Sequence, residues 1–86
     1  MKGQKTMEIN LYSVKDTKMG FEQILVLPNN AAAIRWFGDI SQNKEHPISK
    51  HPEDYQLFKV GTMNEDTGEL VSDVQFLENA TAFHSK

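Results

Sequence analysis

The side chains with the chemistry to hold a metal or move a proton are two histidines and two acidic pairs. His46 and His51 are five residues apart, and each is followed by a proline. This spacing does not place both on one helix face, and no cysteine or carboxylate completes a tetrahedral ligand set with them. The acidic pairs at 53–54 and 65–66 fall in predicted turns, whereas acid–base catalysis needs carboxylates that face each other across a pocket. We therefore expect no catalytic residue, no metal, no cofactor and no enzymatic activity.

A second set of residues could bind single-stranded DNA, which requires a basic groove and aromatic side chains that stack on bases. The candidate contacts are Lys15, Lys18, Arg35, Lys59, Tyr12 and Tyr55. The two tyrosines lie in predicted strands, and a sheet can present aromatic side chains on an open face. Trp36 lies on the apolar stripe of the predicted helix and is expected in the core instead. The net charge of −3 opposes tight, non-specific binding to DNA.

The composition indicates one small domain. The chain has 86 residues and no cysteine, which leaves it without disulfides or thiolate metal sites and fits a reducing compartment. We find no apolar run of about 18 residues and no secretory signal pattern. Residues 1–60 carry eight Lys or Arg and seven Asp or Glu, whereas residues 61–86 carry one and five. This balance excludes a chain-wide basic surface for nucleic acid but leaves a local basic edge on the N-terminal hairpin.

The first half of the chain predicts a hairpin and a helix. Alternating apolar residues begin a strand at residue 7, polar residues 15–20 form a loop, and residues 21–27 return as a second strand. Asn29 or Asn30 is expected to cap a helix whose apolar residues recur every three or four positions. Gly38 weakens this helix and is expected to mark a close approach to the sheet.

The second half predicts a long connection and another hairpin. Residues 41–54 are polar with two prolines and are expected to be irregular. The strand that begins at Tyr55 is followed by the turn 64–68, in which Gly68 supplies a positive φ, and by a return strand from Glu69. Residues 72–80 are expected to add a last short strand or turn. We expect residues 1–6 to be a flexible extension, residues 7–80 one domain, and residues 81–86 a frayed tail in which Phe83 can dock.

These elements predict an α+β fold of order β-β-α-β-β, with one helix packed on one face of a four-stranded antiparallel sheet. The residues expected in the core beneath the helix are Ile9, Leu11, Leu25, Ala33, Trp36, Phe37, Ile40 and Leu57. Apolar residues expected on the opposite sheet face are Tyr12, Val14, Ile24, Val26 and Phe58. A small chain with two apolar sheet faces is expected to form a symmetric homodimer.

Three segments of the sequence resemble the small nonstructural proteins of gokushoviruses, the single-stranded DNA phages of the microvirus group. Residues 11–16 read Leu-Tyr-Ser-Val-Lys-Asp and resemble the first strand of that family. Residues 30–37 read Asn-Ala-Ala-Ala-Ile-Arg-Trp-Phe and resemble its helix. Residues 52–61, followed by Thr67 and Gly68, are similar to its most characteristic signature. The chain departs from the family in the extension at 1–6 and in a longer connection at 41–51.

The resemblance implies a non-enzymatic phage protein made in the cytoplasm of the host bacterium. Members are described as nonstructural or DNA-binding, with a suggested role in the switch to single-stranded genome synthesis and packaging. The resemblance carries no site residue over to this chain. A protein-interaction module that binds a replication or capsid protein without touching DNA is the alternative, and the acidic balance favours it. Single-stranded DNA, a second copy of the chain, and a replication or capsid protein are thus the expected partners, and a membrane is not.

Overall fold

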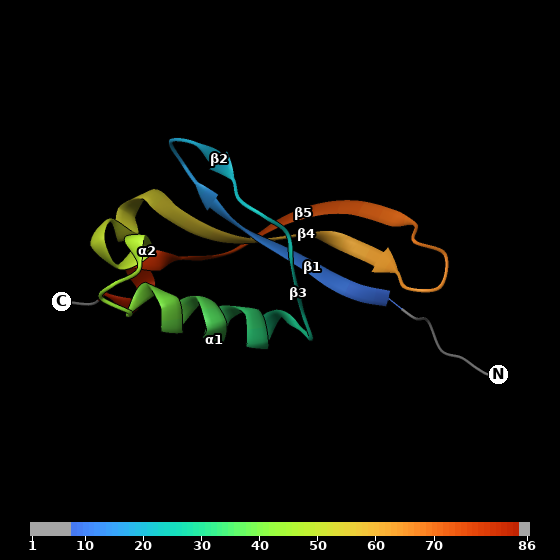
Figure 1. Ribbon diagram of the computed structural model, residues 1–86, viewed down its shortest axis with the longest axis horizontal. Helices are drawn as coiled ribbons and strands as arrows, with labels where there is room; N and C mark the ends of the chain where they lie inside the picture. Colours follow the sequence, from blue (N-terminus) through green and yellow to red (C-terminus); the bar gives the residue numbers. More distant parts are fainter. Residues whose placement is uncertain (1–7, 85–86) are drawn as a thin grey trace.

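The computed structural model describes residues 8–84 (Figure 1). Its elements, in chain order, are β1 (Glu8–Asp16), β2 (Gly20–Phe21), β3 (Leu25–Leu27), α1 (Asn30–Ser41), α2 (Pro47–Lys50), the 3-10 turn η1 (Pro52–Asp54), β4 (Tyr55–Asn64), β5 (Leu70–Asn79) and the 3-10 turn η2 (Ala80–Phe83). The predicted extension at residues 1–6 and the predicted strand residue Met7 lie outside the described residues. Within residues 8–84, no helix is long and apolar enough to cross a membrane.

One antiparallel sheet forms the body of the protein. Its strand order is β2-β1-β4-β5, and β3 pairs with the same edge of β1 as β2 does. Helix α1 lies along one face of this sheet, and the outer part of the β4–β5 hairpin extends past the start of the helix (Figure 1). The predicted α+β fold is therefore confirmed, with five strands in place of four because the second predicted strand is divided.

The division between β2 and β3 comes from one extra residue. On β1, Ser13 and Val14 separate the residues that pair with β3 from those that pair with β2, whereas the returning chain uses the three residues 22–24. The Ser13 hydroxyl donates a hydrogen bond to the Glu22 carbonyl oxygen at 2.8 Å, and the Glu22 N–H donates to the Val14 carbonyl oxygen at 2.8 Å. These two bonds satisfy backbone groups that a regular ladder would otherwise pair.

Helix α1 begins where the sequence predicts. The Asn29 side-chain oxygen accepts a hydrogen bond from the Ala32 N–H at 2.8 Å, which caps the helix. The prediction that Gly38 closely approaches the sheet is wrong. A Cβ on Gly38 would instead lie 2.8 Å from the ring of Phe83, which comes from η2 and also meets Phe37 edge to face.

The connection at residues 41–54 contains the regular elements α2 and η1, so the prediction that it is irregular is wrong. Pro47 opens α2, a position where a proline loses no hydrogen bond. The His46 side chain caps this turn, since its Nδ1 accepts a hydrogen bond from the Ile48 N–H at 3.2 Å. Ile48 is fully buried and closes one end of the core.

The second hairpin is longer and simpler than predicted. Residues expected as a return strand and a separate last strand form the single ten-residue strand β5. The turn before it follows the predicted chemistry: the Asn64 side-chain oxygen accepts from the backbone N–H groups of Asp66 and Thr67, and Gly68 has φ 81°. After β5, the chain turns back at η2, so that Ala80 is buried and Phe83 packs on the core.

The core beneath α1 corrects the predicted orientation of β1. Buried apolar residues of this core are Tyr12, Val14, Ala33, Phe37, Ile48, Leu57 and Ala80, with Trp36 and Ile40 packed against them. Ala33, Phe37 and Leu57 were predicted there, and Tyr12 and Val14 were wrongly placed on the opposite face. Leu11 was wrongly placed beneath the helix. It is buried on the opposite face, where it lines a groove with Val60 and with Ile24, which was predicted on that face. Because β1 alternates, Ile9 shares the face of Leu11 and is not beneath the helix either.

Candidate nucleic-acid interface

The sheet face opposite α1, here called the open face, is apolar and uncovered in the described chain. Its large exposed side chains are Phe21, Ile24, Val26, Leu70, Val74 and Phe76. Ile24, Val26 and Phe58 were predicted on this face, and the strand register confirms their placement. Exposed apolar patches larger than a few hundred Å² commonly mark surfaces that bind another molecule.

Three phenylalanine rings cross one end of the open face, and we call them the aromatic row. Phe21 on β2 meets Phe58 on β4 with ring centroids 5.2 Å apart, and Phe58 meets Phe76 on β5 at 5.6 Å. Both contacts are edge to face, with 75° between the ring planes. The outer rings are half free, with Phe21 47% and Phe76 49% exposed. The row therefore offers aromatic surface to a ligand at two separate points.

A cation stands next to the aromatic row. The Lys15 ammonium lies 5.5 Å from the centroid of the Phe21 ring, within the range of a cation–π contact. Lys15 and Phe21 are paired across β1 and β2, so the sheet itself holds them side by side. The arrangement combines a stacking surface with a positive charge.

The acidic residues of the strands lie away from this face. Because side chains alternate along β1, Glu8 and Asp16 lie on the same side of the sheet as Tyr12, which is the helix side. Gln75 lies on this side too, since it pairs with Lys59, the partner of Tyr12. The Asp73 carboxylate accepts a hydrogen bond from the Gln75 side chain and therefore shares that side. Glu78 pairs with the core residue Leu57. Among the strand residues that the structure describes, Lys15 is the only charged one at an open-face position. The open face is thus locally positive although the whole chain carries −3.

The structure does not bring the six predicted DNA contacts together. Tyr12 is fully buried in the core, and its hydroxyl donates a hydrogen bond to the Asn30 side-chain oxygen at 2.8 Å. Burial raises the pKa of Tyr12. Lys59 pairs with Tyr12 on the helix side of the sheet, and Arg35 is exposed on α1. Tyr12 therefore cannot present its ring to a base, contrary to the prediction.

The other predicted contacts divide between the two faces. Tyr55 is half-buried opposite Asp16 on the helix side. Its pKa is raised by burial and, to a smaller extent, by the negative charges of Asp16, Glu22 and Asp54. Lys18 lies in the turn after β1 and forms an ion pair with Asp54 at 3.1 Å. Lys15 alone among the six lies on the open face.

Sequence reasoning assigned Phe58 to the correct face but did not recognise the aromatic row. Phe21 and Phe76 are far apart in the sequence and meet Phe58 only through strand pairing. The signal available was one aromatic residue in each predicted strand, Phe21 at the start of 21–27 and Phe76 in the middle of 72–80. Because the strand register is not written in the sequence, that signal could not place the rings together.

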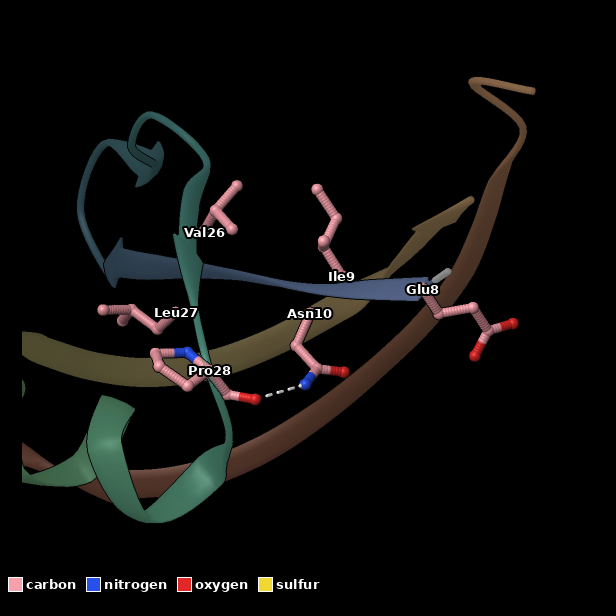
Figure 2. Close-up of a pocket in the computed structure, with 6 residues that line it drawn as sticks. All are labelled: Glu8, Ile9, Asn10, Val26, Leu27 and Pro28. Atoms are coloured by element: carbon pink, nitrogen blue, oxygen red, sulfur yellow. Dashed lines mark hydrogen bonds between the residues drawn. The ribbon is translucent and has the colours of Figure 1, made fainter. Parts of the chain in front are cut away.

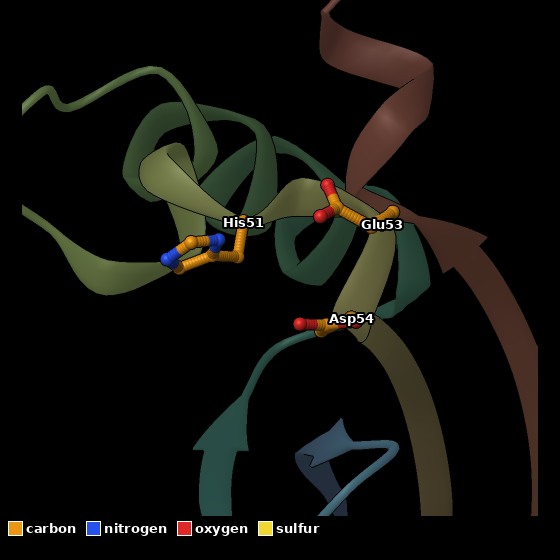
Figure 3. A group of neighbouring side chains, drawn as sticks. All are labelled: His51, Glu53 and Asp54. Carbon is orange, nitrogen blue, oxygen red and sulfur yellow. The ribbon is translucent and has the colours of Figure 1, made fainter.

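The structure gathers a histidine and two acids at η1. Figure 3 shows His51, Glu53 and Asp54 around this turn, and one ligand atom from each lies within 4.8 Å of the others. His51 and Glu53 are exposed, and Asp54 is already paired with the Lys18 ammonium, which would compete with a metal ion. His46 is not part of the group because it caps α2. The absence of a metal stays a prediction.

A shallow groove of about 330 Å³ lies where β3 crosses the start of β1 (Figure 2). Ile9 and Val26 point to one side of the strands there, and Asn10, Leu27 and Pro28 lie on the other. The Asn10 side-chain amide donates a hydrogen bond to the Pro28 carbonyl oxygen at 2.9 Å, so it is not free for a ligand. Glu8 is the one ionisable group among the lining residues. A single carboxylate does not provide the paired acid and base that general acid–base catalysis uses.

Comparison with known proteins identifies the lineage of this fold. A family model described as Phage ORF5 protein matches residues 9–83, from the second residue of β1 to the last residue of η2. No curated protein and no solved structure matches the chain. The phage origin expected from the sequence is therefore confirmed: the chain belongs to the Phage ORF5 protein family.

Proposed function

We propose that this phage protein binds single-stranded DNA on its open face, with bases stacked on the aromatic row and a phosphate held by Lys15. The observation that carries this proposal is the contact of Phe21, Phe58 and Phe76 across three strands, with Lys15 over one end. Sheets that bind single-stranded nucleic acid use the same combination of exposed aromatic rings and nearby cations.

The distribution of charge supports DNA binding despite the acidic total. A phosphate near Lys15 would lie on the sheet face that carries no carboxylate at its strand positions, because Glu8, Asp16 and Asp73 occupy the helix side. The sheet therefore lies between these carboxylates and the Lys15 ammonium. With a single cation at the row, stacking contributes more of the affinity than phosphate contacts do, and the salt dependence should be shallow.

The biological role that fits this binding is non-enzymatic and nonstructural. The family match supports a phage protein, and the resemblance to gokushovirus proteins supports action during single-stranded genome synthesis or packaging in the cytoplasm of the host bacterium. In that role, the protein would bind the single strand as it leaves the replication machinery and cover it until it is packaged.

The aromatic row is tested by titrating a fluorescently labelled single-stranded oligothymidine with the full chain and with two variants of one residue. Phe76→Tyr keeps a ring that can stack, whereas Phe76→Leu keeps apolar area without a ring. Because base–aromatic stacking is worth about 1–3 kcal/mol, Phe76→Leu should weaken binding about tenfold and Phe76→Tyr should change it little. Equal effects of the two variants would contradict a stacking role.

The cation is tested with a matched pair of lysines. Lys15→Ala should weaken binding and reduce the slope of log affinity against log salt by about 0.7, the value expected for one phosphate contact on a single strand. Lys18→Ala removes the same charge from the neighbouring turn, where the ammonium is paired with Asp54, and should leave the slope unchanged. If the wild-type chain does not bind DNA at low salt, the protein-interaction module becomes the better account, and the next step is a pull-down with replication and capsid proteins.

A further inference from the structure

The open face carries a second feature beside the aromatic row. It is a groove of about 310 Å³ that we call the aliphatic groove, lined by Leu11, Phe21, Ile24, Val60, Leu70, Val71, Ser72 and Val74. Leu70 is 66% exposed, Ile24 59% and Val74 57%. We propose that a second copy of this chain packs face to face over the aliphatic groove and forms a two-fold symmetric dimer.

The edges of the sheet are poor sites for this association. The outer edge of β1 is covered by β2 and β3. The outer edge of β5 is free, but its pairing with β4 shifts register twice, between Leu57 and Phe58 and between Lys59 and Gly61. Bulges of this kind interrupt the regular backbone ladder and protect an edge strand from pairing with another chain. The open face is the remaining apolar surface of the sheet.

The charge of the open face allows it to meet a copy of itself. In a two-fold interface, each residue faces the same surface on the partner, so like charges would repel. The aliphatic groove contains no charged residue, and the acidic strand residues lie on the helix side. Two chains of net charge −3 can therefore approach through this face with their carboxylates directed away from the contact.

The exposed apolar area of the open face supplies part of what a dimer interface buries. Five large apolar side chains of the open face, without the far end of the aromatic row, are 47% to 66% exposed, namely Phe21, Ile24, Val26, Leu70 and Val74. Half-exposed side chains of these types contribute on the order of 400–500 Å² in total. That lies within the roughly 300–600 Å² of the largest apolar patch on a typical monomer, which is often functional, and it supplies about half of the roughly 800 Å² that each partner of a standard interface buries.

The dimer does not depend on DNA. The aliphatic groove and the aromatic row share Phe21 at their boundary, while Phe58 and Phe76 lie beyond the groove lining. A second copy over the groove leaves Phe58 and Phe76 outside the contact but covers part of Phe21, so DNA that reaches Lys15 would compete with the dimer for this end of the row. Association is measured in the absence of DNA, so its failure and the failure of DNA binding are separate results.

Sedimentation equilibrium of the full chain at tens of micromolar tests the proposal. The wild-type protein should sediment at twice the chain mass. Val74→Lys places a charge in the aliphatic groove and should weaken the dimer at least about 30-fold, the loss typical of a central interface residue. Gln75→Lys introduces the same charge at the next position of β5, on the opposite side of the sheet, and should leave the dimer intact.

Ile24→Lys provides a second disrupting variant outside the regular strands, since residues 22–24 lie between β2 and β3. Both substituted side chains are more than half exposed in the single chain, so circular dichroism should show that the variants fold. A wild-type monomer at these concentrations would overturn the proposal. A dimer that survives both Val74→Lys and Ile24→Lys would overturn it too, because the interface would then lie elsewhere.

Discussion

The hydroxyl of Tyr12 donates a hydrogen bond to the side-chain oxygen of Asn30 at 2.8 Å, which joins the middle of β1 to the first residue of α1. The ring of Tyr12 is fully buried between the sheet and the helix. Because β1 alternates, the face that buries Tyr12 beneath the helix leaves Leu11 on the open face.

Tyr12→Phe should destabilise the protein by about 1 kcal/mol. The variant keeps the ring and removes one hydrogen bond, and such a bond contributes roughly 0.5–1.5 kcal/mol. Because Asn30 is exposed, water can replace the lost partner, which holds the cost near the middle of that range. Urea unfolding followed by tryptophan fluorescence measures the change. DNA affinity serves as the control and should be unaltered, since Tyr12 does not reach the open face.

Stability should fall when the pH rises above 10.0, the ordinary pKa of a tyrosine. Burial raises the pKa of Tyr12 in the folded chain, so the folded state holds this proton more tightly than the unfolded state does. The contribution is fully present below the unfolded pKa and is lost as the pH rises through the folded pKa. Urea midpoints on either side of pH 10.0 should show a smaller drop for Tyr12→Phe than for wild type. An identical drop would mean that other groups cause the alkaline loss.

Gly38→Ala should destabilise the wild-type chain, although alanine favours a helix over glycine by about 1 kcal/mol. The added methyl group would lie 2.8 Å from the Phe83 ring and displace it from Phe37. In a Phe83→Ala background, the same substitution should become stabilising because the ring is gone. A double-mutant cycle in urea measures this coupling. Additive effects of the two changes would contradict the predicted contact.

Gly61→Ala should cost about 2 kcal/mol or more. Gly61 has φ 153°, and a Cβ there would collide with the Val71 carbonyl oxygen on β5. Gly68→Ala is the matched control, because Gly68 also has a positive φ, 81°, but faces open space. Thermal unfolding should therefore rank Gly61→Ala well below Gly68→Ala, and the reverse order would refute the close approach of β4 and β5 at this point.

The sequence predicts the helix and the strands well because their signals are local. Asn29 caps α1 through its own side chain, and the spacing of Ala33 and Phe37 places both against the sheet. The turn at 64–68 likewise forms through Asn64 and Gly68, which act within a few residues. Such interactions depend on neighbouring residues and can be read from residue types.

The faces of β1 could not be predicted for the opposite reason. Both of its faces carry apolar residues, and a period of two does not say which set lies beneath the helix. The choice depends on packing between distant segments, in which Tyr12 and Val14 meet Ala33 and Phe37 of α1 in the core. The aromatic row depends in the same way on pairing among β1, β2, β4 and β5, including the shifts of register in β4 and β5 that no local pattern announces.

The packing of η2 on α1 has a consequence for the synthesis of the protein. Ala80 is fully buried and Phe83 covers Gly38, so the last described turn completes the core begun by α1. A growing chain on the ribosome can form the first hairpin and α1 early, but it cannot close the core before residues 80–83 emerge from the exit tunnel. Until then, the apolar side of α1 is open to chaperones and proteases. The duration of that exposure includes the time needed to translate β4, β5 and η2.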